Sequence, residues 1–357
     1  MQANKKVKLI LENGLEFEGY SFGYDQPANG EVVFSTAMVG YPETLTDPSY
    51  SGQILVSTYP ILGNYGVPSN EKENSIEKFF ESGKIHVNAL IITDYSFDYS
   101  HWNAVKSLDD WMKEEKVPGI YGVDTRELTK TLRENGSMLG KIVPEGCSAE
   151  FEAVDPNKTN KVEQVSCKEV TRYGNGDKRV VLVDCGAKNS IIRWLLGNGV
   201  EVIRVPWNYD FNTLEYDGLC ISNGPGDPNF CTETVKNIQK AMENGKPVCG
   251  ICMGNQLLAL AAGAKVFKLK YGHRGHNQPV RMNNTTSCFI TSQNHGYAVD
   301  MESLPSDWEA LFINMNDNTC EGIRHKSKPF FSAQFNPQAA GVSPVTNKLF
   351  DEFFKML

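Results

Sequence analysis

The sequence predicts an α/β protein of two domains, an α+β domain followed by a domain built on a mostly parallel sheet flanked by helices. The chain has 357 residues, more than one hydrophobic core usually supports. Strand-like alternation dominates its first part, and short apolar runs separated by helical stretches fill its last part. A polar segment without periodicity lies between them. We therefore expect an amino-terminal domain over 1–145, a linker over 146–178 and a second domain over 179–357.

The amino-terminal domain begins with a predicted β-hairpin. Residues 7–11 and 15–20 alternate between apolar and polar side chains, and the tight-turn dipeptide Asn13-Gly14 separates them. A helix is expected wherever apolar residues recur at helical spacing after a capping residue. The remaining elements expected here are strands at 31–34 and 52–57 and helices at 107–112 and 124–132, with Ser107 and Asp124 as the capping residues.

Four short apolar runs define the sheet that we expect in the second domain. Each run has the length of a buried strand, and helical stretches separate the runs along the chain. Strands connected in this way lie parallel in a sheet whose two faces are covered by helices. The runs are 180–183, 200–205, 218–222 and 247–251.

Composition excludes several classes of function. Hydrophobic residues make up 40% of the chain, but no apolar run approaches the ~20 residues that span a bilayer, so no membrane segment is expected. The first residues, 1–6, have no signal-peptide core, which predicts a cytoplasmic location. A net charge of −8 argues against binding to nucleic acid, which needs a basic surface.

The cysteines and histidines predict neither a disulfide framework nor a metal site. Nine cysteines is an odd number, and they are scattered rather than paired in CxxC motifs. His273 and His276 are too closely spaced in the sequence, and too poorly supported by other ligands, to predict a zinc site. We therefore expect no metal ligands in the chain.

Cys252 is the residue that most clearly predicts chemistry. The motif Gly250-Ile251-Cys252-Met253-Gly254 joins an apolar run to a helical pattern, and its glycines permit a sharp turn from strand to helix. We expect this turn to expose Cys252 at the carboxyl end of the sheet. The free N–H groups that begin the next helix favour a thiolate there. A small buried cysteine is the simpler interpretation of Cys185, Cys220 and Cys249.

A second glycine-containing loop, 222–228, follows the preceding apolar run. Gly224 and Gly226 permit close approach of the backbone to a ligand. Their N–H groups, with that of Met253, are candidates for an oxyanion hole that stabilises a tetrahedral adduct on Cys252. Taken alone, the loop is equally compatible with a tight turn.

The two motifs together resemble the paired signature of class I glutamine amidotransferases, triad-type enzymes in which a cysteine attacks the side-chain amide of glutamine. In the amino-terminal half, the segments 40–50, 63–66 and 119–126 are similar to the small subunit of carbamoyl phosphate synthetase. This resemblance implies that the chain hydrolyses L-glutamine and passes ammonia to a large subunit, which makes carbamoyl phosphate for arginine and pyrimidine biosynthesis. It implies no cofactor in this chain. ATP and Mg²⁺ are expected on the large subunit, since no GxxxxGK[ST] loop occurs here.

The resemblance also assigns the residues that bind glutamine. The side chains at 253 and 297 differ from those usual in the family, but both positions act largely through the backbone. The implied binding residues are Ser49, Gly224, Gly226, Met253, Gln256, Asn294, Gly296 and Tyr297.

The carboxyl-terminal part departs from the family pattern. Where the family has a His-Pro-Glu segment, with histidine as general base and glutamate orienting it, this chain has Asn336-Pro337-Gln338. The following segment, 341–344, is altered as well. An amide takes no proton from Cys252 at ordinary pH, and Gln338 carries no charge to stabilise an imidazolium. We therefore expect glutamine to bind while its hydrolysis is impaired.

These departures leave alternatives open. His295, inside the segment 293–297, is a candidate for a substitute base, although a structural role is the simpler interpretation. One alternative function is a catalytically degenerate partner that stabilises or regulates an ammonia-dependent synthetase. Another is a free-standing cysteine hydrolase on the same fold, which would need no partner. Release of ammonia from glutamine, with and without the large subunit, distinguishes them.

Overall fold

The computed structural model describes residues 5–338 and 344–357, and the chain divides into two compact units, 1–158 and 159–357. The division falls inside the segment 146–178 that we expected as a linker. Part of that segment, β14 (Thr171–Tyr173), pairs with a strand of the second unit. Of the altered segment 341–344, residues 341–343 lie outside the described residues, as do 1–4.

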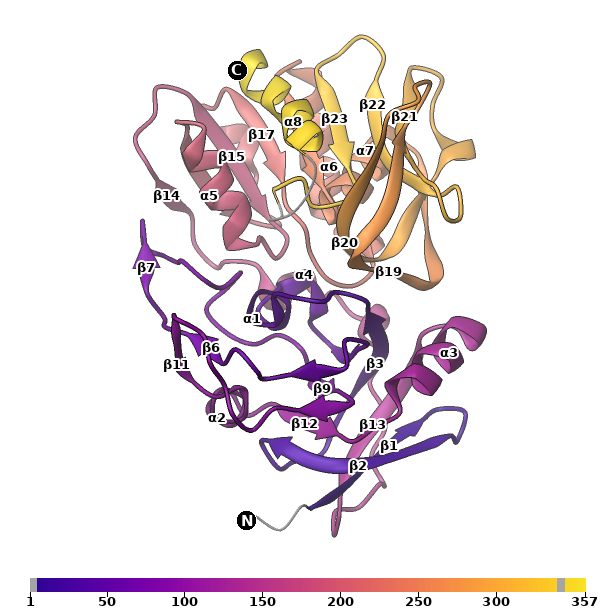
Figure 1. Ribbon diagram of the computed structural model, residues 1–357. Helices are drawn as coiled ribbons and strands as arrows, with labels where there is room; N and C mark the ends of the chain where they lie inside the picture. Colours follow the sequence, from indigo (N-terminus) through magenta and orange to yellow (C-terminus); the bar gives the residue numbers. More distant parts are fainter. Residues whose placement is uncertain (1–4, 339–343) are drawn as a thin grey trace. The chain divides into compact units, whose positions relative to one another are not determined.

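The first unit is built on a closed barrel with the strand order β1-β13-β3-β4-β9-β12-β2 (Figure 1). The predicted hairpin is confirmed, because β1 and β2 pair antiparallel. The pairs β3–β4, β4–β9 and β9–β12 are parallel, and these long-range pairings close the barrel. The strands are β1 (Lys6–Leu11), β2 (Glu16–Gly23), β3 (Ala28–Ser35), β4 (Gln53–Ser57), β9 (Ala89–Ile91), β12 (Pro118–Tyr121) and β13 (Met138–Pro144).

Both helices predicted in the first unit are confirmed, with their caps. The side chains of Ser107 and Asp124 accept hydrogen bonds from the backbone N–H groups of Asp110 and Glu127, the first turns of α2 and α3. Such bonds satisfy N–H groups that lack a partner within the helix. The helices and short elements are α1 (Tyr41–Leu45), η1 (Pro48–Tyr50), α2 (Leu108–Glu114), α3 (Thr125–Asn135), β5 (Ile61–Leu62), β6 (Val67–Pro68), β7 (Lys72–Glu73), β8 (Ile76–Glu77), β10 (Asp94–Tyr95) and β11 (Ala104–Lys106).

The second unit contains a ten-stranded sheet in the order β14-β16-β15-β17-β18-β23-β22-β20-β19-β21. Neighbours from β16 to β23 in this order are parallel, which confirms the predicted parallel sheet. The antiparallel strands β19 to β22 extend it, and the sequence patterns did not predict them. The strands are β15 (Arg179–Asp184), β16 (Glu201–Pro206), β17 (Gly218–Ile221), β18 (Val248–Ile251), β19 (Lys265–Met282), β20 (Cys288–Asp300), β21 (Trp308–Asn314), β22 (Cys320–His325) and β23 (Phe330–Ala333).

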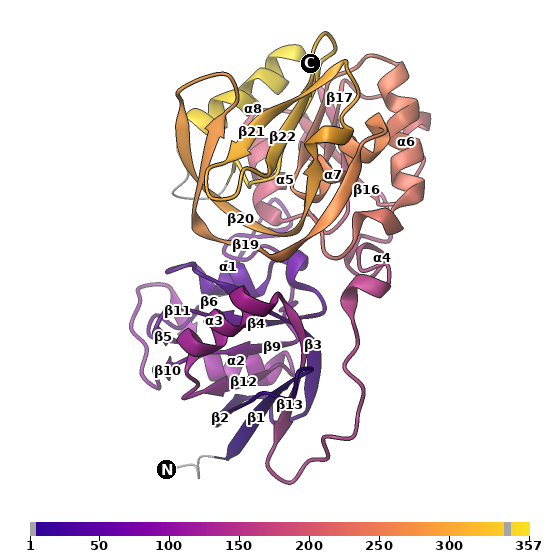
Figure 2. The same ribbon diagram turned by 90° about the vertical axis from the view of Figure 1, so that its right-hand side faces the viewer.

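Helices cover both faces of the parallel part of this sheet. Figures 1 and 2 show α5 and α8 on one face and α6 and α7 on the other. On the first face, Trp194 of α5 packs edge-on against Phe350 of α8, with ring centroids 5.7 Å apart. On the second, Leu257 and Leu258 of α7 are fully buried in the main core. The helices are α4 (Val162–Val165), α5 (Asn189–Gly197), α6 (Thr232–Glu243), α7 (Met253–Ala262) and α8 (Pro344–Met356).

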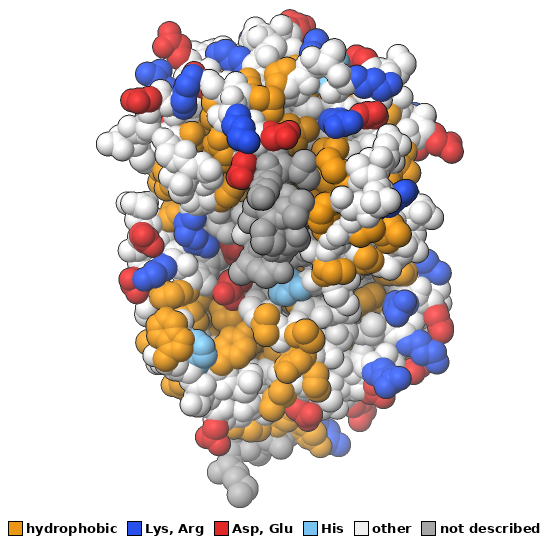
Figure 3. Space-filling model, turned by 45° about the horizontal axis from the view of Figure 1, so that its top comes forward, with side chains coloured by type: hydrophobic (Ala, Val, Ile, Leu, Met, Phe, Trp, Pro, Cys, Tyr) orange, Lys and Arg blue, Asp and Glu red, His pale blue; other side chains and the backbone are white. Residues whose placement is uncertain are grey.

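Charged residues of both signs lie on the face of the molecule that Figure 3 presents. On the face that Figure 3 presents, acidic and basic side chains are interspersed. Such mixing favours solubility. Among the helices that the structure describes, none has the length and apolar character required to cross a membrane.

Candidate active site

Cys252 occupies the whole connection between β18 and α7. Strand β18 ends at Ile251 and helix α7 begins at Met253, so one residue makes the turn, with φ 56° and ψ −104°. A non-glycine residue held at positive φ stores about 1–3 kcal/mol of strain, which packing on either side must offset. Such strain is characteristic of functional sites, and it confirms the sharp turn that the sequence predicted.

The glycines on either side of Cys252 are required by close contacts of the backbone. A Cβ atom at Gly254 would lie 2.1 Å from the carbonyl oxygen of Ile221 at the end of β17. A Cβ atom at Gly250 would lie 2.4 Å from the carbonyl oxygen of Gly254. Neither oxygen belongs to a side chain that could rotate away. The two glycines therefore let α7 begin directly against the sheet.

The sulfur of Cys252 is buried, contrary to the expected exposure, with only 2% of the residue accessible. Its thiol donates a hydrogen bond to the backbone carbonyl of Asn294 on β20, with 3.5 Å between sulfur and oxygen. A carbonyl oxygen accepts this bond only from the protonated thiol. The accepting carbonyl belongs to β20, a strand that the sequence patterns missed.

The loop 222–228 lies at the same edge of the sheet as Cys252. Strands β17 and β18 are parallel neighbours, so the segments that follow them leave the sheet together. A Cβ atom at Gly224 would lie 2.2 Å from the carbonyl oxygen of Cys185, and Gly226 has φ +79°. Met253 is the first residue of α7, where an N–H group has no partner within the helix. The loop and the helix start therefore supply N–H groups at one edge.

Asn336 also lies at this edge. Strand β23 pairs with β18 in parallel, with Ala333 beside Ile251, and the N–H of Cys252 donates to the carbonyl of Ala333 over 2.8 Å. Asn336 follows three residues later and is 4% exposed. The register thus brings Asn336 to the edge that carries Cys252.

Neither amide near this edge offers an acid or a base. The side-chain nitrogen of Gln338 donates to the hydroxyl of Ser190 over 3.4 Å. The side-chain oxygens of Asn336 and Gln338 are buried and have no hydrogen-bond partner among the residues that the structure describes. A side-chain amide neither takes up nor releases a proton at ordinary pH, so neither residue supplies acid–base chemistry at this edge.

Three of the expected glutamine-binding residues meet in the second unit. The side-chain nitrogen of Gln256 on α7 donates to the carbonyl oxygen of Tyr297 over 2.9 Å and to the side-chain oxygen of Gln334 over 3.1 Å. Asn294, on the same strand as Tyr297, accepts from Cys252. Gly296 lies between them on β20. Ser49 belongs to the first unit, where its N–H donates to the carboxylate of Asp47 over 2.9 Å.

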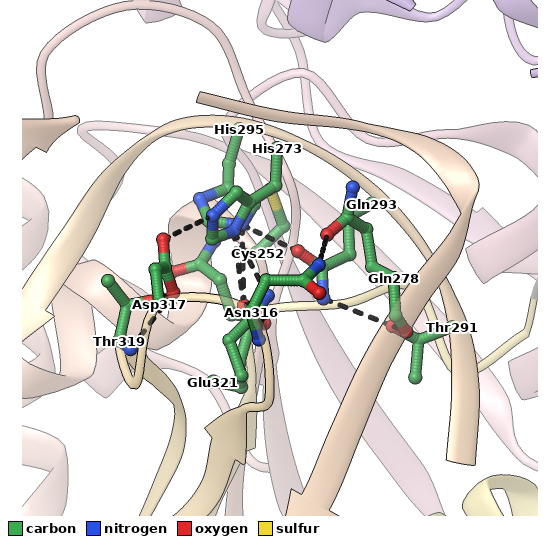
Figure 4. A network of polar contacts seen from close by, with 12 residues as sticks. Cys252, His273, Gln278, Thr291, Gln293, His295, Asn316, Asp317, Thr319 and Glu321 are labelled. Atoms are coloured by element: carbon green, nitrogen blue, oxygen red, sulfur yellow. Dashed lines mark hydrogen bonds and ion pairs between the residues drawn. The ribbon is translucent and has the colours of Figure 1, made fainter. Parts of the chain in front are cut away.

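Sequence reasoning missed a buried cluster of titratable side chains beside this site (Figure 4). His273 on β19 and His295 on β20 are cross-strand partners, and Glu321 comes from β22. One ligand atom from each of these three residues lies within 4.8 Å of the others, so they could hold a metal ion. His276, the partner considered from sequence, is exposed. The pairing of β19 with β20 creates the cluster, and spacing along the chain gives no signal of it.

Hydrogen bonds within the protein already occupy most of the ligand atoms of this cluster. Both ring nitrogens of His273 face carboxylates, Asp317 at 2.8 Å and Glu321 at 3.2 Å. The amide of Asn314 donates to Glu321 over 2.9 Å. Burial alone would lower the pKa of His273, but the hydrogen bonds to Asp317 and Glu321 outweigh it and raise the pKa to about 9.

Comparison with known proteins agrees with the division into two domains. Residues 181–356 match the family described as "Glutamine amidotransferase class-I". Residues 9–142 match "Carbamoyl-phosphate synthase small chain, CPSase domain". The second unit is therefore a class I glutamine amidotransferase domain, and the chain as a whole belongs to the carbamoyl-phosphate synthase small-chain family.

Individual relatives cover nearly all of this chain. It is 47% identical over 367 residues to the "Carbamoyl phosphate synthase arginine-specific small chain" of Eremothecium gossypii, which covers 99% of this chain and 92% of the relative. It is 50% identical to the mouse "Carbamoyl-phosphate synthase [ammonia], mitochondrial", over 99% of this chain but 24% of the relative. It is 51% identical to the "Multifunctional protein CAD" of Squalus acanthias, over 97% of this chain and 16% of the relative. The chain thus spans a quarter or less of the length of the latter two.

Proposed function

We propose that this protein is the glutamine-binding subunit of a carbamoyl phosphate synthetase, and that it hydrolyses glutamine slowly through a thioester on Cys252. The observation that carries the proposal is the strained turn at Cys252. The turn lies between two glycines, at positions where any side chain would collide with the backbone. The family membership and the loop 222–228 at the same edge support it. Ammonia would pass to a large subunit that makes carbamoyl phosphate for arginine and pyrimidine biosynthesis.

Glutamine would be held by groups that remain intact in this chain. Gln256, Asn294 and Tyr297 already lie together, and hydrogen bonds fix the side chain of Gln256. We assign glutamine binding to Ser49, Gly224, Gly226, Met253, Gln256, Asn294, Gly296 and Tyr297. In this assignment, the N–H groups of Gly224, Gly226 and Met253 stabilise the oxyanion.

The reaction has two steps, and each needs a proton to move. In the first, the sulfur of Cys252 attacks the side-chain amide carbon of glutamine, the C–N bond breaks, and the thiol proton leaves with the nitrogen as ammonia. In the second, water attacks the thioester, giving glutamate and the free thiol. A histidine at position 336 would carry the proton in both steps. Asn336 has no group that does so, and the loss of a general base costs about 10²–10⁴ in rate.

Glutamine binding and proton transfer use separate residues, so glutamine binding should survive the loss of proton transfer. The expected product of slow chemistry is a glutamyl thioester on Cys252, because no base activates the incoming water. His295 is the remaining candidate for a substitute base. Both of its ring nitrogens are within hydrogen-bond distance of other groups, the carbonyl of Tyr297 at 2.7 Å and the amide of Gln293 at 2.9 Å. These contacts favour its structural role.

A second candidate function is a partner that supports an ammonia-dependent synthetase without hydrolysing glutamine. The replacement of both proton-carrying residues favours it, and the mouse relative's name specifies ammonia. The third possibility considered, a free-standing cysteine hydrolase, is disfavoured because residues 9–142 match the small-chain domain. In both remaining proposals, ATP and Mg²⁺ bind to the large subunit and this chain holds no cofactor.

The two functions are separated by ammonia release from glutamine, measured on the purified chain with and without the large subunit. Slow release that disappears in Cys252→Ser supports a crippled amidotransferase. Stimulation of ammonia-dependent synthesis, without release from glutamine, supports the second function. Loss of release in His295→Ala would show that a substitute base had been recruited.

We also propose a cytoplasmic location, since nine free cysteines are typical of a reducing compartment. The mouse relative's name gives mitochondria, and fractionation of the source cells tests the assignment.

A further inference from the structure

The side chain of Gln256 is held in one orientation by two acceptors. Gln256 lies one helical turn after Cys252, and its N–H donates to the Cys252 carbonyl over 3.4 Å, so the two side chains share one face of α7. Its Nε2 donates one hydrogen to the Tyr297 carbonyl on β20 over 2.9 Å. The other hydrogen goes to Oε1 of Gln334, directly after β23, over 3.1 Å. Both hydrogens of this nitrogen are therefore committed.

The Tyr297 carbonyl determines the orientation of two amides. The nitrogen and oxygen of a carboxamide have nearly the same shape, so their hydrogen-bond partners decide which of them points where. A backbone carbonyl can only accept, so the nitrogen of Gln256 must face Tyr297. The second hydrogen of that nitrogen then requires an acceptor, which turns Oε1 of Gln334 toward Gln256.

Two further buried residues hold Gln334. The side-chain nitrogen of Asn255 donates to the same Oε1 of Gln334 over 2.9 Å. The hydroxyl of Ser332 on β23 donates to Oδ1 of Asn255 over 2.8 Å. Gln334, Asn255 and Ser332 are all completely buried. Reversal of the Gln334 amide would set its N–H groups against those of Asn255 and Gln256, so this network allows Gln334 a single orientation.

The orientation of Gln334 leaves a buried donor without a partner. Its Nε2 has no hydrogen bond to any residue that the structure describes. An unmade hydrogen bond in a buried group costs free energy. What this orientation provides is an acceptor for Gln256. Local features that oppose stability are expected at functional sites.

Only the oxygen of the Gln256 side chain remains for a ligand. With Nε2 turned toward Tyr297 and Gln334, Oε1 lies on the other side of the carboxamide, and no hydrogen bond reaches it within the described part of the chain. A carbonyl oxygen accepts hydrogen bonds and donates none. Gln256 in this orientation therefore recognises a group that carries an N–H and disfavours a second acceptor.

We propose that Gln334 is a positioning residue for glutamine, which fixes the Gln256 carboxamide so that the site selects a ligand with an N–H donor. The inference rests on the proposed function, in which Gln256 touches glutamine. Glutamine has two such donors, its side-chain amide and its α-ammonium group. Glutamate has a carboxylate in place of the first, and glutaramate, the same carbon chain without the amino group, lacks the second. A site that accepts from an N–H rejects the analogue without it, because the buried acceptor is left unpaired.

The test is calorimetric titration of the full chain with L-glutamine, L-glutamate and glutaramate. Gln334→Met keeps the length of the side chain but removes the acceptor, so the Gln256 carboxamide can rotate and turn an N–H toward the ligand. We expect the preference for glutamine over one of the two analogues to fall about tenfold, equivalent to one hydrogen bond. The analogue concerned identifies the donor that Gln256 recognises. A folded Gln334→Met protein with both preferences unchanged would overturn the proposal.

Two control variants separate positioning from stability. Each preference is a ratio of two Kd values for one protein, so a general loss of stability leaves it unchanged. Gln334→Glu retains an oxygen toward Gln256 in either protonation state and should keep both preferences within about threefold. Gln53→Met is the matched substitution in the first unit, because Gln53 is also a buried glutamine with one unpartnered side-chain atom, and it should change neither preference. Losses as large as that of Gln334→Met in either control would contradict the proposal.

The unmodified chain provides a test that needs no variant. It should bind at least one of the two analogues about tenfold or more weakly than glutamine, since the acceptor then lacks its donor. Equal affinity for all three ligands would overturn the inference and leave the proposed function standing. If the chain binds no glutamine, the proposed function fails and the inference falls with it, which is a distinct outcome.

Discussion

Gly254→Ala tests whether the turn at Cys252 is as tightly enclosed as the structure indicates. The added Cβ would lie 2.1 Å from the oxygen, 2.8 Å from the carbon and 3.0 Å from the Cβ of Ile221. Two of these atoms are backbone in the centre of the sheet, so no rotamer change relieves the contact. Overpacking costs about 1–3 kcal/mol and occasionally more, and a rigid neighbour places this change at the upper end. We expect a loss of about 3 kcal/mol, equivalent to about 6–12 °C in Tm for a domain of this size.

Gly197→Ala is the matched control, because Gly197 is also helical, at the end of α5, and a Cβ there would meet no atom within 4 Å. Alanine in a helix without such contacts stabilises by about 0.5–1 kcal/mol. The two variants should therefore differ by about 3–4 kcal/mol in the free energy of unfolding, measured by urea titration. Equal stability of the two variants would refute the close approach of α7 to β17 and, with it, the account of the turn.

Three further predictions concern Cys252, the other cysteines and acid stability. Cys252→Gly should be more stable than Cys252→Ala by about 1–3 kcal/mol, since only glycine relieves the positive φ; the reverse order in urea unfolding would mean that the turn is unstrained. Iodoacetamide should label the exposed Cys147 and Cys288 before the buried Cys252, and mass-spectrometric mapping that finds Cys252 first would show that its burial is wrong. Burial, with a smaller effect of Lys84, lowers the pKa of His86 to about 4, below the ordinary value of 6.5. The unfolded chain therefore binds this proton first, and stability should fall as the pH drops from 6.5 to 4. His86→Gln should flatten that slope in urea midpoints taken at several pH values, and an unchanged slope would count against a neutral, partly buried ring.

Local sequence patterns predicted the elements whose conformation is determined by residues close to them in the sequence. The turn at Cys252 follows from two glycines within five residues, and the hairpin follows from Asn13-Gly14 between alternating segments. The parallel strands β15 to β18 were recognised because each contains a short, mainly apolar run. In these elements, the determining interactions lie within about ten residues along the chain.

Long-range pairing produced what the sequence patterns missed. The long hairpin of β19 and β20 has mixed burial along its length, so neither strand shows clean alternation. Its register places His273 opposite His295, and it supplies the Asn294 carbonyl that accepts from the Cys252 thiol. Closure of the first barrel likewise depends on β4, β9 and β12, which lie far apart in sequence. No periodicity within a segment encodes which other segment it pairs with.

Restoring both missing residues tests the central claim most directly, that this chain binds glutamine in a site whose proton chemistry is disabled. Ammonia release from glutamine is measured for the unmodified chain, for Asn336→His, for Gln338→Glu and for the double variant, with Cys252→Ser added as the control. We predict a rise of at least about 10²-fold in the double variant, the low end for regaining a general base, and complete loss with Cys252→Ser. Asn336→His alone should recover part of the rate, and Gln338→Glu alone should recover little, since an orienting group then has no imidazole to orient. An unmodified chain that hydrolyses glutamine as fast as the double variant, and continues to do so without Cys252, would contradict the account.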